Sequence, residues 1–301
     1  MIAKDSIFEG LGVALVTPYR KGAVDTDAAS RLAEHLVERG VRALYPCGCT
    51  GEATSLTREE RSKLIRAVVE AVRGRASVVA GTGTANTDET IDLSKEAIRL
   101  GADAVMVITP YSVRPTQEGL VAHYRAVAAA IDRPMVLYNV PARTGSSIAP
   151  ETVAKLAENP RIAAIKEASG SVDQTSAIRA RCDITVLSGD DSLYLALLAV
   201  GARGLVSVAG HLVPAELVEL ERHFHAGRIG EAEAVHRRLT PLFKALFLET
   251  SPAPVKHALA RLGWIADEIR LPLVPVRPET GKAVEAAMDG VGLAESARKS
   301  A

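Results

Sequence analysis

Short apolar runs alternate with longer amphipathic segments from the start of the chain to about residue 227. Each run is brief and continuously apolar, which is typical of a strand buried on both faces. Each is followed by apolar residues at helical spacing. The runs cover residues 11–16, 43–45, 77–80, 104–108, 134–138, 162–165, 185–187 and 204–208.

Strict alternation of strand and helix predicts a parallel sheet, and eight repeats are the number that closes a (β/α)8, or TIM, barrel. We therefore predict an α/β barrel over residues 1–227. The strand pattern then stops, and segments 228–248, 252–262 and 278–289 have helical spacing. These segments predict a C-terminal helical extension over residues 228–290. The small and polar residues 291–301 predict a frayed tail.

Local signals agree with these elements. Thr57 and Glu60 have the spacing of a capping box, which predicts that a helix begins at this point. Gly40, Gly101 and Gly201 each follow a helical segment and precede an apolar run. Glycine is common at this position because helices often end in a left-handed residue.

The composition argues against several classes of partner. Lys plus Arg and Asp plus Glu both number 36, so no net charge favours nucleic acid or an anionic membrane. No apolar run reaches the length of a membrane span, and we expect a cytoplasmic protein with reduced cysteines. Cys47 and Cys49 are separated by one residue, which is not the spacing of a zinc site. We expect neither a metal nor a cofactor.

The sixth apolar run leads directly into Lys166. A lysine is unfavourable at the end of a buried strand, because desolvation of the ammonium lowers its pKa. An amine with a lowered pKa is a nucleophile, suited to forming a Schiff base with a ketone. The alternative is that Lys166 pairs with a buried carboxylate and only stabilises the strand end.

In a (β/α)8 barrel the active site lies at the C-terminal ends of the strands. The residues at the predicted ends include one lysine, two tyrosines and several small hydroxyl and glycine residues, but no histidine. Tyr138 is one of these tyrosines, and its alternative role is that of a core residue with a satisfied hydroxyl. Residues 48–51 form either a plain turn or, because glycines flank Cys49 and Thr50, a turn whose amides bind an anion.

Several of these segments are similar to those of one known family. The segments are YNVPARTG at 138–145, IKEASG at 165–170, GCTGE at 48–52, RPTQEGL at 114–120 and LSGDD at 187–191. They resemble the dihydrodipicolinate synthases, of the pyruvate-dependent class I aldolase superfamily that includes N-acetylneuraminate lyase. SPAPVKHAL at 251–259 matches as well, so the resemblance covers nearly the whole chain.

The resemblance implies a role for each candidate residue. Lys166 would form an imine and then an enamine with pyruvate, and Tyr138 would shuttle protons as a general acid and base. The amides and hydroxyl around Thr50, with Cys49, would hold the pyruvate carboxylate. Arg143 would bind the carboxylate of L-aspartate 4-semialdehyde through a bidentate contact. The other substrate-binding residues implied are Gly189 and Val206, through backbone atoms, and Tyr111.

Two positions depart from the family pattern. The family has a second threonine where this chain has Cys49, and a second tyrosine directly after the one at 111, where this chain has Ser112. In the family that threonine links two tyrosines in a proton relay, and the second tyrosine reaches across a dimer interface. A thiol is a weak hydrogen-bond donor and serine is too short to replace a phenol, which leaves the relay of this chain open.

The function implied is the condensation of pyruvate with L-aspartate 4-semialdehyde in lysine and diaminopimelate biosynthesis, by a homotetramer. One alternative is a sibling aldolase or dehydratase acting on a 2-keto-3-deoxy acid. Arg143 argues against this alternative, whereas Cys49 and Ser112 keep it open. Another alternative is a barrel that binds a keto acid but turns it over poorly.

The resemblance also bears on regulation. In family members that respond to lysine, a histidine on the second helix and an asparagine after the third strand hold the effector. Here those positions are Arg61 and Ala85. A cationic arginine repels the ammonium groups of lysine, which predicts weak or absent feedback inhibition.

Overall fold

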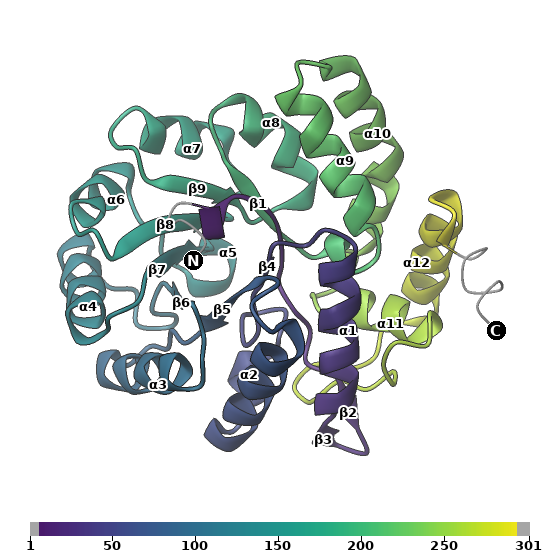
Figure 1. Ribbon diagram of the computed structural model, residues 1–301, viewed down its shortest axis with the longest axis horizontal. Coiled ribbons are helices and arrows are strands. Elements are labelled where there is room, and N and C mark those ends of the chain that lie inside the picture. Colours follow the sequence, from purple (N-terminus) through teal and green to yellow (C-terminus); the bar gives the residue numbers. More distant parts are fainter. Residues whose placement is uncertain (1–5, 294–301) are drawn as a thin grey trace.

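Eight parallel strands close into a barrel in the computed structural model, which describes residues 6–293 (Figure 1). Neighbouring strands follow one another in chain order, and the last pairs with the first. The predicted (β/α)8 barrel is therefore confirmed. The strands are β1 (Gly10–Val13), β4 (Ala43–Leu44), β5 (Ser77–Gly81), β6 (Ala104–Ile108), β7 (Met135–Asn139), β8 (Ile162–Glu167), β9 (Thr185–Ser188) and β10 (Gly204–Ser207).

A helix follows each barrel strand, and these helices surround the barrel in Figure 1. Thr57 and Glu60 form the predicted capping box at the start of α2, with hydrogen bonds in both directions. The helices are α1 (Thr26–Glu38), α2 (Arg58–Val72), α3 (Thr87–Arg99), α4 (Gln117–Ala130), α6 (Pro150–Ala157), α7 (Val172–Arg179), α8 (Tyr194–Ala199) and α9 (Pro214–His225), with a short α5 (Pro141–Thr144) before α6. Short 3-10 turns, η1 (Ser6–Phe8), η2 (Ala53–Ser55), η3 (Asp191–Leu193) and η4 (Ala209–His211), complete the set.

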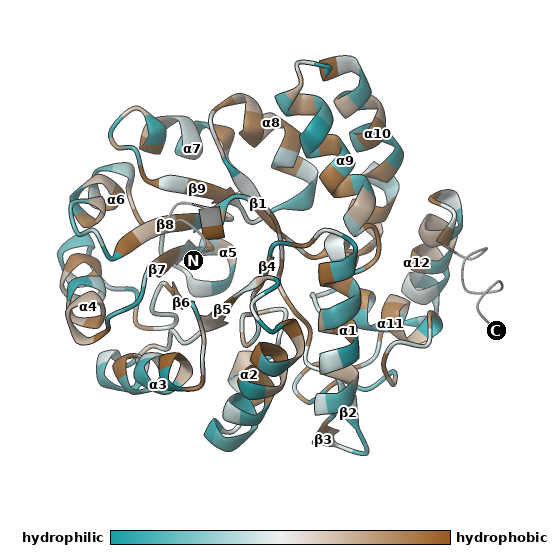
Figure 2. Cartoon of the chain, in the orientation of Figure 1, coloured by the Kyte–Doolittle hydropathy of each residue, from teal (hydrophilic) through white to brown (hydrophobic). Residues whose placement is uncertain are grey.

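Alternate residues of each strand face two different cores. On β7, Val136 and Tyr138 belong to the cluster inside the barrel, whereas Met135 and Leu137 pack against the surrounding helices. On β8 the inward Ala164 is followed by the outward Ile165, because side chains alternate along a strand. Lys166, the next residue, therefore faces inward. Figure 2 shows the matching pattern, with hydrophilic colour on the outer faces of the helices.

The C-terminal extension consists of α10 (Ile229–Ala245), α11 (Ala253–Arg261) and α12 (Pro278–Gly290). α10 packs on α9, and α12 packs on both α10 and α11. α11 also contacts η4, beside the end of β10, so the extension reaches the C-terminal face of the barrel. The domain boundary at residue 227 stays a prediction. The predicted frayed tail lies, from residue 294 on, outside the described residues.

Two details differ from the expectations. The first strand ends at Val13, although Ala14–Val16 are buried, Ala14 still donates to the carbonyl of Ser207 on β10, and Leu15 donates to the carbonyl of Tyr45 just after β4. A run of apolar residues in the sequence indicates where the chain is buried, and here the buried segment is longer than the segment with regular strand hydrogen bonds. The two-residue strands β2 (Tyr19–Arg20) and β3 (Ala23–Val24) form a hairpin too short to leave a periodic signal. No helix within residues 6–293 has the length and apolar character needed to cross a membrane.

Candidate active site

Lys166 lies inside the barrel near the C-terminal end of β8 and is 4 % exposed. Among the described residues it forms no hydrogen bond and no ion pair with a carboxylate. The alternative that Lys166 pairs with a buried carboxylate is therefore wrong. Burial lowers its pKa to about 8; Arg143 acts in the same direction, and the charges of Cys49 and Asp191 oppose it. A substantial fraction of this amine is neutral near pH 8, as a nucleophile requires.

Tyr138 is the register partner of Lys166 on the neighbouring strand. The Nζ atom of Lys166 lies 4.4 Å from the centroid of the Tyr138 ring. Burial raises the pKa of Tyr138, and the negative charge that Cys49 can carry adds to this shift. A neutral phenol beside a neutral amine can donate a proton to the oxygen that leaves during imine formation.

The turn between β4 and η2, residues 48–52, presents free backbone donors. The amide of Glu52 donates to the carbonyl of Cys49 at 3.1 Å, and the amide of Ala53 donates to that of Gly48 at 3.2 Å. The amides of Thr50 and Gly51 have no acceptor among residues 6–293. Thr50 is 6 % exposed, so these donors belong to a largely buried part of the turn. Successive free amides in a turn favour binding of an anion such as a carboxylate.

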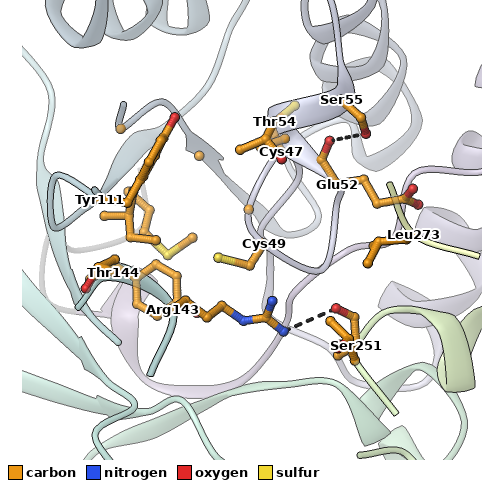
Figure 3. A pocket seen from close by; sticks show the side chains of 18 of the residues that line it. Cys47, Cys49, Glu52, Thr54, Ser55, Tyr111, Arg143, Thr144, Ser251 and Leu273 are labelled. Carbon is orange, nitrogen blue, oxygen red and sulfur yellow. Dashed lines mark hydrogen bonds between the residues drawn. The ribbon is translucent and has the colours of Figure 1, made fainter. Parts of the chain in front are cut away.

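A cavity of about 300 Å³ opens beside this turn. Its wall includes Cys49, Tyr138, Tyr111 and Arg143, so the structure brings these predicted residues together. The exposed Arg143 side chain extends across the cavity and donates from Nη2 to the carbonyl oxygen of Ser251 at 3.2 Å (Figure 3). The C-terminal extension therefore contributes to the wall of the site.

The other predicted residues lie off this wall. They are Lys166, Thr50, Gly189 and Val206. A Cβ atom at Gly189 would lie 2.6 Å from the Cβ of Ala168 and 3.1 Å from the Cε of Lys166. The position therefore requires glycine and lies directly against the lysine. Val206 is 1 % exposed within the inner cluster, and its substrate contact stays a prediction.

Ser112 lies apart from this constellation. It is exposed, has a positive φ of 72° and does not line the cavity, whereas its neighbour Tyr111 does. Cys49 occupies the expected position near Tyr138: both side chains line the cavity, and Cys49 acts on the pKa of Tyr138. This chain therefore retains the contact between position 49 and Tyr138, with a thiol in place of a hydroxyl.

Reasoning from sequence missed three buried charged residues near the site. Asp191 accepts from the amides of Val208 and Ala209, both at 3.0 Å, and from the hydroxyl of Ser207. Glu52, in the turn after β4, and Lys256, on α11, form a buried ion pair. Asp191 and Glu52 stand at predicted strand ends, and Lys256 interrupts an otherwise apolar helical stripe. These positions in the sequence could have indicated that the three residues lie near the site.

His211 has a structural role. Its Nε2 accepts from the amide of Val16 at 3.2 Å, and its Nδ1 lies 2.8 Å from the carbonyl oxygen of Val208. Burial lowers the pKa of His211 to about 4, so the ring is neutral near pH 7. Over residues 6–293, no group of three or more His, Cys, Asp or Glu side chains could hold a metal ion.

A (β/α)8 barrel with an unpaired, buried lysine and a tyrosine at its C-terminal face has the features of an enzyme that activates ketones through a Schiff base. The model of the dihydrodipicolinate synthetase family matches residues 7–290, and the chain belongs to this family. The family expected from the sequence is thereby confirmed.

Known relatives are similar over most of the chain. A 4-hydroxy-tetrahydrodipicolinate synthase from Pelobacter propionicus is 45% identical over 95% of this chain and 100% of its own length. One from Synechococcus elongatus is 49% identical over 93% of this chain and 95% of its own. The crystal structure of the dihydrodipicolinate synthase from Aquifex aeolicus superimposes with a TM-score of 0.93 at 42% identity, covering 95% of this chain and 99% of that one.

Proposed function

We propose that this chain condenses pyruvate with L-aspartate 4-semialdehyde through a Schiff base on Lys166, the reaction of a 4-hydroxy-tetrahydrodipicolinate synthase. The observation that carries the proposal is the unpaired Lys166, buried 4.4 Å from the ring centroid of Tyr138. Membership of the family supports the reaction type. The position of Arg143 on the cavity wall supports a second, anionic substrate.

The reaction begins when the neutral amine of Lys166 attacks the C2 carbonyl of pyruvate. Tyr138 delivers a proton to the carbinolamine oxygen, and this oxygen leaves as water to give the protonated imine and the Tyr138 phenolate. The phenolate then takes a proton from C3, which gives the enamine and restores the phenol. Its C3 carbon attacks the aldehyde carbon, and the aldehyde oxygen takes up the proton that Tyr138 returns.

Two anion sites orient the substrates in this proposal. The free amides of Thr50 and Gly51, with the Thr50 hydroxyl, hold the pyruvate carboxylate. Arg143 holds the carboxylate of the aldehyde substrate by exchanging its single bond to Ser251 for a charge-assisted bidentate contact. Gly189 leaves room for the stem of Lys166 beside the new imine.

Trapping with borohydride tests the proposal. Pyruvate with borohydride is expected to reduce the imine, label Lys166 and inactivate the protein, and peptide mapping locates the adduct. Lys166→Met is expected to remain unlabelled, and Tyr138→Phe to label more slowly. An adduct on another lysine, or none at all, would refute the mechanism.

A sibling aldolase or dehydratase acting on a 2-keto-3-deoxy acid is the second candidate. The thiol at Cys49 and the exposed Ser112 favour it, because both depart from the family pattern. A coupled assay with pyruvate and a panel of aldehydes separates the two, and turnover of aspartate semialdehyde supports the first. Imine formation without turnover of any aldehyde would indicate a keto-acid-binding protein instead.

We also propose a cytoplasmic homotetramer. Membership of the family supports this proposal. A monomeric dihydrodipicolinate synthase variant has been solved, and it superimposes with a TM-score of 0.93 at 40% identity, covering 96% of this chain and 98% of that one. Light scattering after gel filtration measures the oligomeric state, and a monomeric mass would contradict the proposal.

A further inference from the structure

A buried ion pair joins the C-terminal extension to the turn at residues 48–52. The Nζ of Lys256, on α11, lies 2.7 Å from Oε1 of Glu52, and the two side chains are 2% and 1% exposed. The other carboxylate oxygen of Glu52 accepts from the amide of Arg270 at 3.3 Å. The ammonium of Lys256 also lies 4.2 Å from the ring centroid of Tyr19. These added contacts offset part of the cost of burying two charges.

The backbone of this turn needs such support. Glu52 has φ 53° and ψ 38°, and Cys47, just before the turn, has φ 58°. Left-handed conformations are unfavourable for residues other than glycine, and they persist where surrounding contacts hold them. The hydroxyl of Thr17 donates to the carbonyl of Gly51 at 2.6 Å, and the Lys256–Glu52 ion pair holds the next residue from the other side.

We infer that Lys256 is a positioning residue, whose ion pair with Glu52 holds the free amides of Thr50 and Gly51 in the arrangement that receives a carboxylate. The identity of that carboxylate as pyruvate rests on the proposed function, whereas the role of the ion pair in holding the turn does not. Removal of Lys256 leaves the charge of Glu52 buried without its partner. The uncompensated carboxylate of Glu52 then moves toward solvent, and this movement loosens the turn.

Cysteine accessibility tests this inference without pyruvate. Cys47, 2% exposed, and Cys49 report on the turn, and Cys182, shortly after the end of α7, is an internal reference. In Lys256→Met, which keeps the apolar stem, alkylation of Cys47 by iodoacetamide is expected to accelerate at least about fivefold with Cys182 unchanged. Peptide mass spectrometry measures each rate.

Leu259→Ala is the matched control, because Leu259 is fully buried on the same helix. Its loss loosens the packing of α11 and leaves the ion pair in place, so we expect its Cys47 to react as in the unmodified chain. An unchanged Cys47 rate in Lys256→Met would overturn the inference. An equal acceleration in Leu259→Ala would overturn it as well.

Pyruvate binding provides the second readout. The pyruvate concentration that gives half-maximal borohydride trapping is expected to rise about tenfold in Lys256→Met and to stay unchanged in Leu259→Ala. In the double mutant Glu52→Gln, Lys256→Met, the pyruvate concentration for half-maximal trapping is expected to rise by less than the product of the two single increases, because neither charge is left buried without its partner. Strictly multiplicative losses would contradict a paired role. If the unmodified chain formed no imine, the proposed function would fail, and the alkylation rates would still decide the role of Lys256.

Discussion

Lys166 and Tyr138 are register partners on adjacent strands, with the lysine nitrogen 4.4 Å from the centroid of the tyrosine ring. Both side chains point into the barrel because their positions have the same parity in the pleat. Burial lowers the pKa of the Lys166 amine and raises the pKa of the Tyr138 phenol. Near pH 8 a substantial fraction of the amine and nearly all of the phenol are neutral, which suits a nucleophile and a proton donor.

The rate of imine formation is expected to depend on pH through Lys166. The neutral amine is the reactive form, and its pKa of about 8 means that its fraction rises up to that pH and then levels. At low pyruvate we therefore expect the trapping rate to rise about tenfold per pH unit below the midpoint. Stopped-flow or rapid-quench trapping between pH 6 and 10 measures it. A rate that still rises steeply at pH 10 would mean an unperturbed lysine.

Replacement of Lys166 by methionine is expected to stabilise the fold. The pKa is about 8 when folded and near 10.5 when unfolded, so the unfolded chain binds the proton more tightly and protonation favours unfolding. At pH 7 the gain in unfolding free energy is about 3 kcal/mol, and at pH 10 it falls below about 1 kcal/mol. Urea unfolding at both pH values measures the difference. A gain that does not depend on pH would point to packing alone.

Arg143→Ala is expected to weaken the aldehyde substrate far more than pyruvate. A bidentate charge-assisted contact contributes about 2–3 kcal/mol, so kcat/KM for the aldehyde falls at least about tenfold. Arg143→Lys keeps the positive charge but cannot form the bidentate contact, so its kcat/KM for the aldehyde is expected to fall less than that of Arg143→Ala. Steady-state kinetics with each substrate varied in turn measure both effects. Equal losses for the two substrates would mean that Arg143 acts structurally, through Ser251.

Cys49→Thr is expected to change kcat about two- to tenfold and to leave pyruvate binding nearly unchanged, because it replaces a thiol near Tyr138 with a hydroxyl that can form one neutral hydrogen bond. Combination with Ser112→Tyr tests whether a relay can be rebuilt. If the change in kcat of the double mutant exceeds the product of the two single changes, positions 49 and 112 are coupled. Ser112→Gly is the control for the positive φ of this residue. Strict additivity would mean that protons reach Tyr138 by another route, such as water or Tyr111.

Feedback inhibition by lysine is expected to be weak or absent. Arg61 lies in a small pocket of about 210 Å³ beside the active-site cavity, together with Glu89 and Tyr111. Its guanidinium donates to the carbonyl oxygens of Ala53 and Gly81, which fixes its charge at this place.

Arg61→His combined with Ala85→Asn is the informative variant for this pocket. It removes the permanent cation and restores the two residue types that lysine-responsive relatives are expected to have, so inhibition by millimolar lysine is expected to appear. The coupled assay measures it. Sub-millimolar inhibition of the unmodified chain would contradict the repulsion attributed to Arg61.

The alternation of buried runs and amphipathic segments determined the barrel, because each strand must be apolar on both faces to lie between core and helices. The same pattern placed Lys166 and Tyr138 at the reactive end, since strand ends are visible in a sequence. The capping box at Thr57 could also be predicted from the sequence, because it depends only on two residues three positions apart.

Tertiary structure alone decided which charges meet. Glu52 and Lys256 are 204 residues apart in the chain, and no local spacing brings them to 2.7 Å. The same holds for the contact of Arg143 with Ser251. Whether Lys166 was paired or free could not be read from its own strand, because the answer depends on which carboxylates other segments bring near it. The carboxylate of Asp191 accepts hydrogen bonds from the backbone amides of Val208 and Ala209. Lys166 therefore forms no ion pair among the described residues.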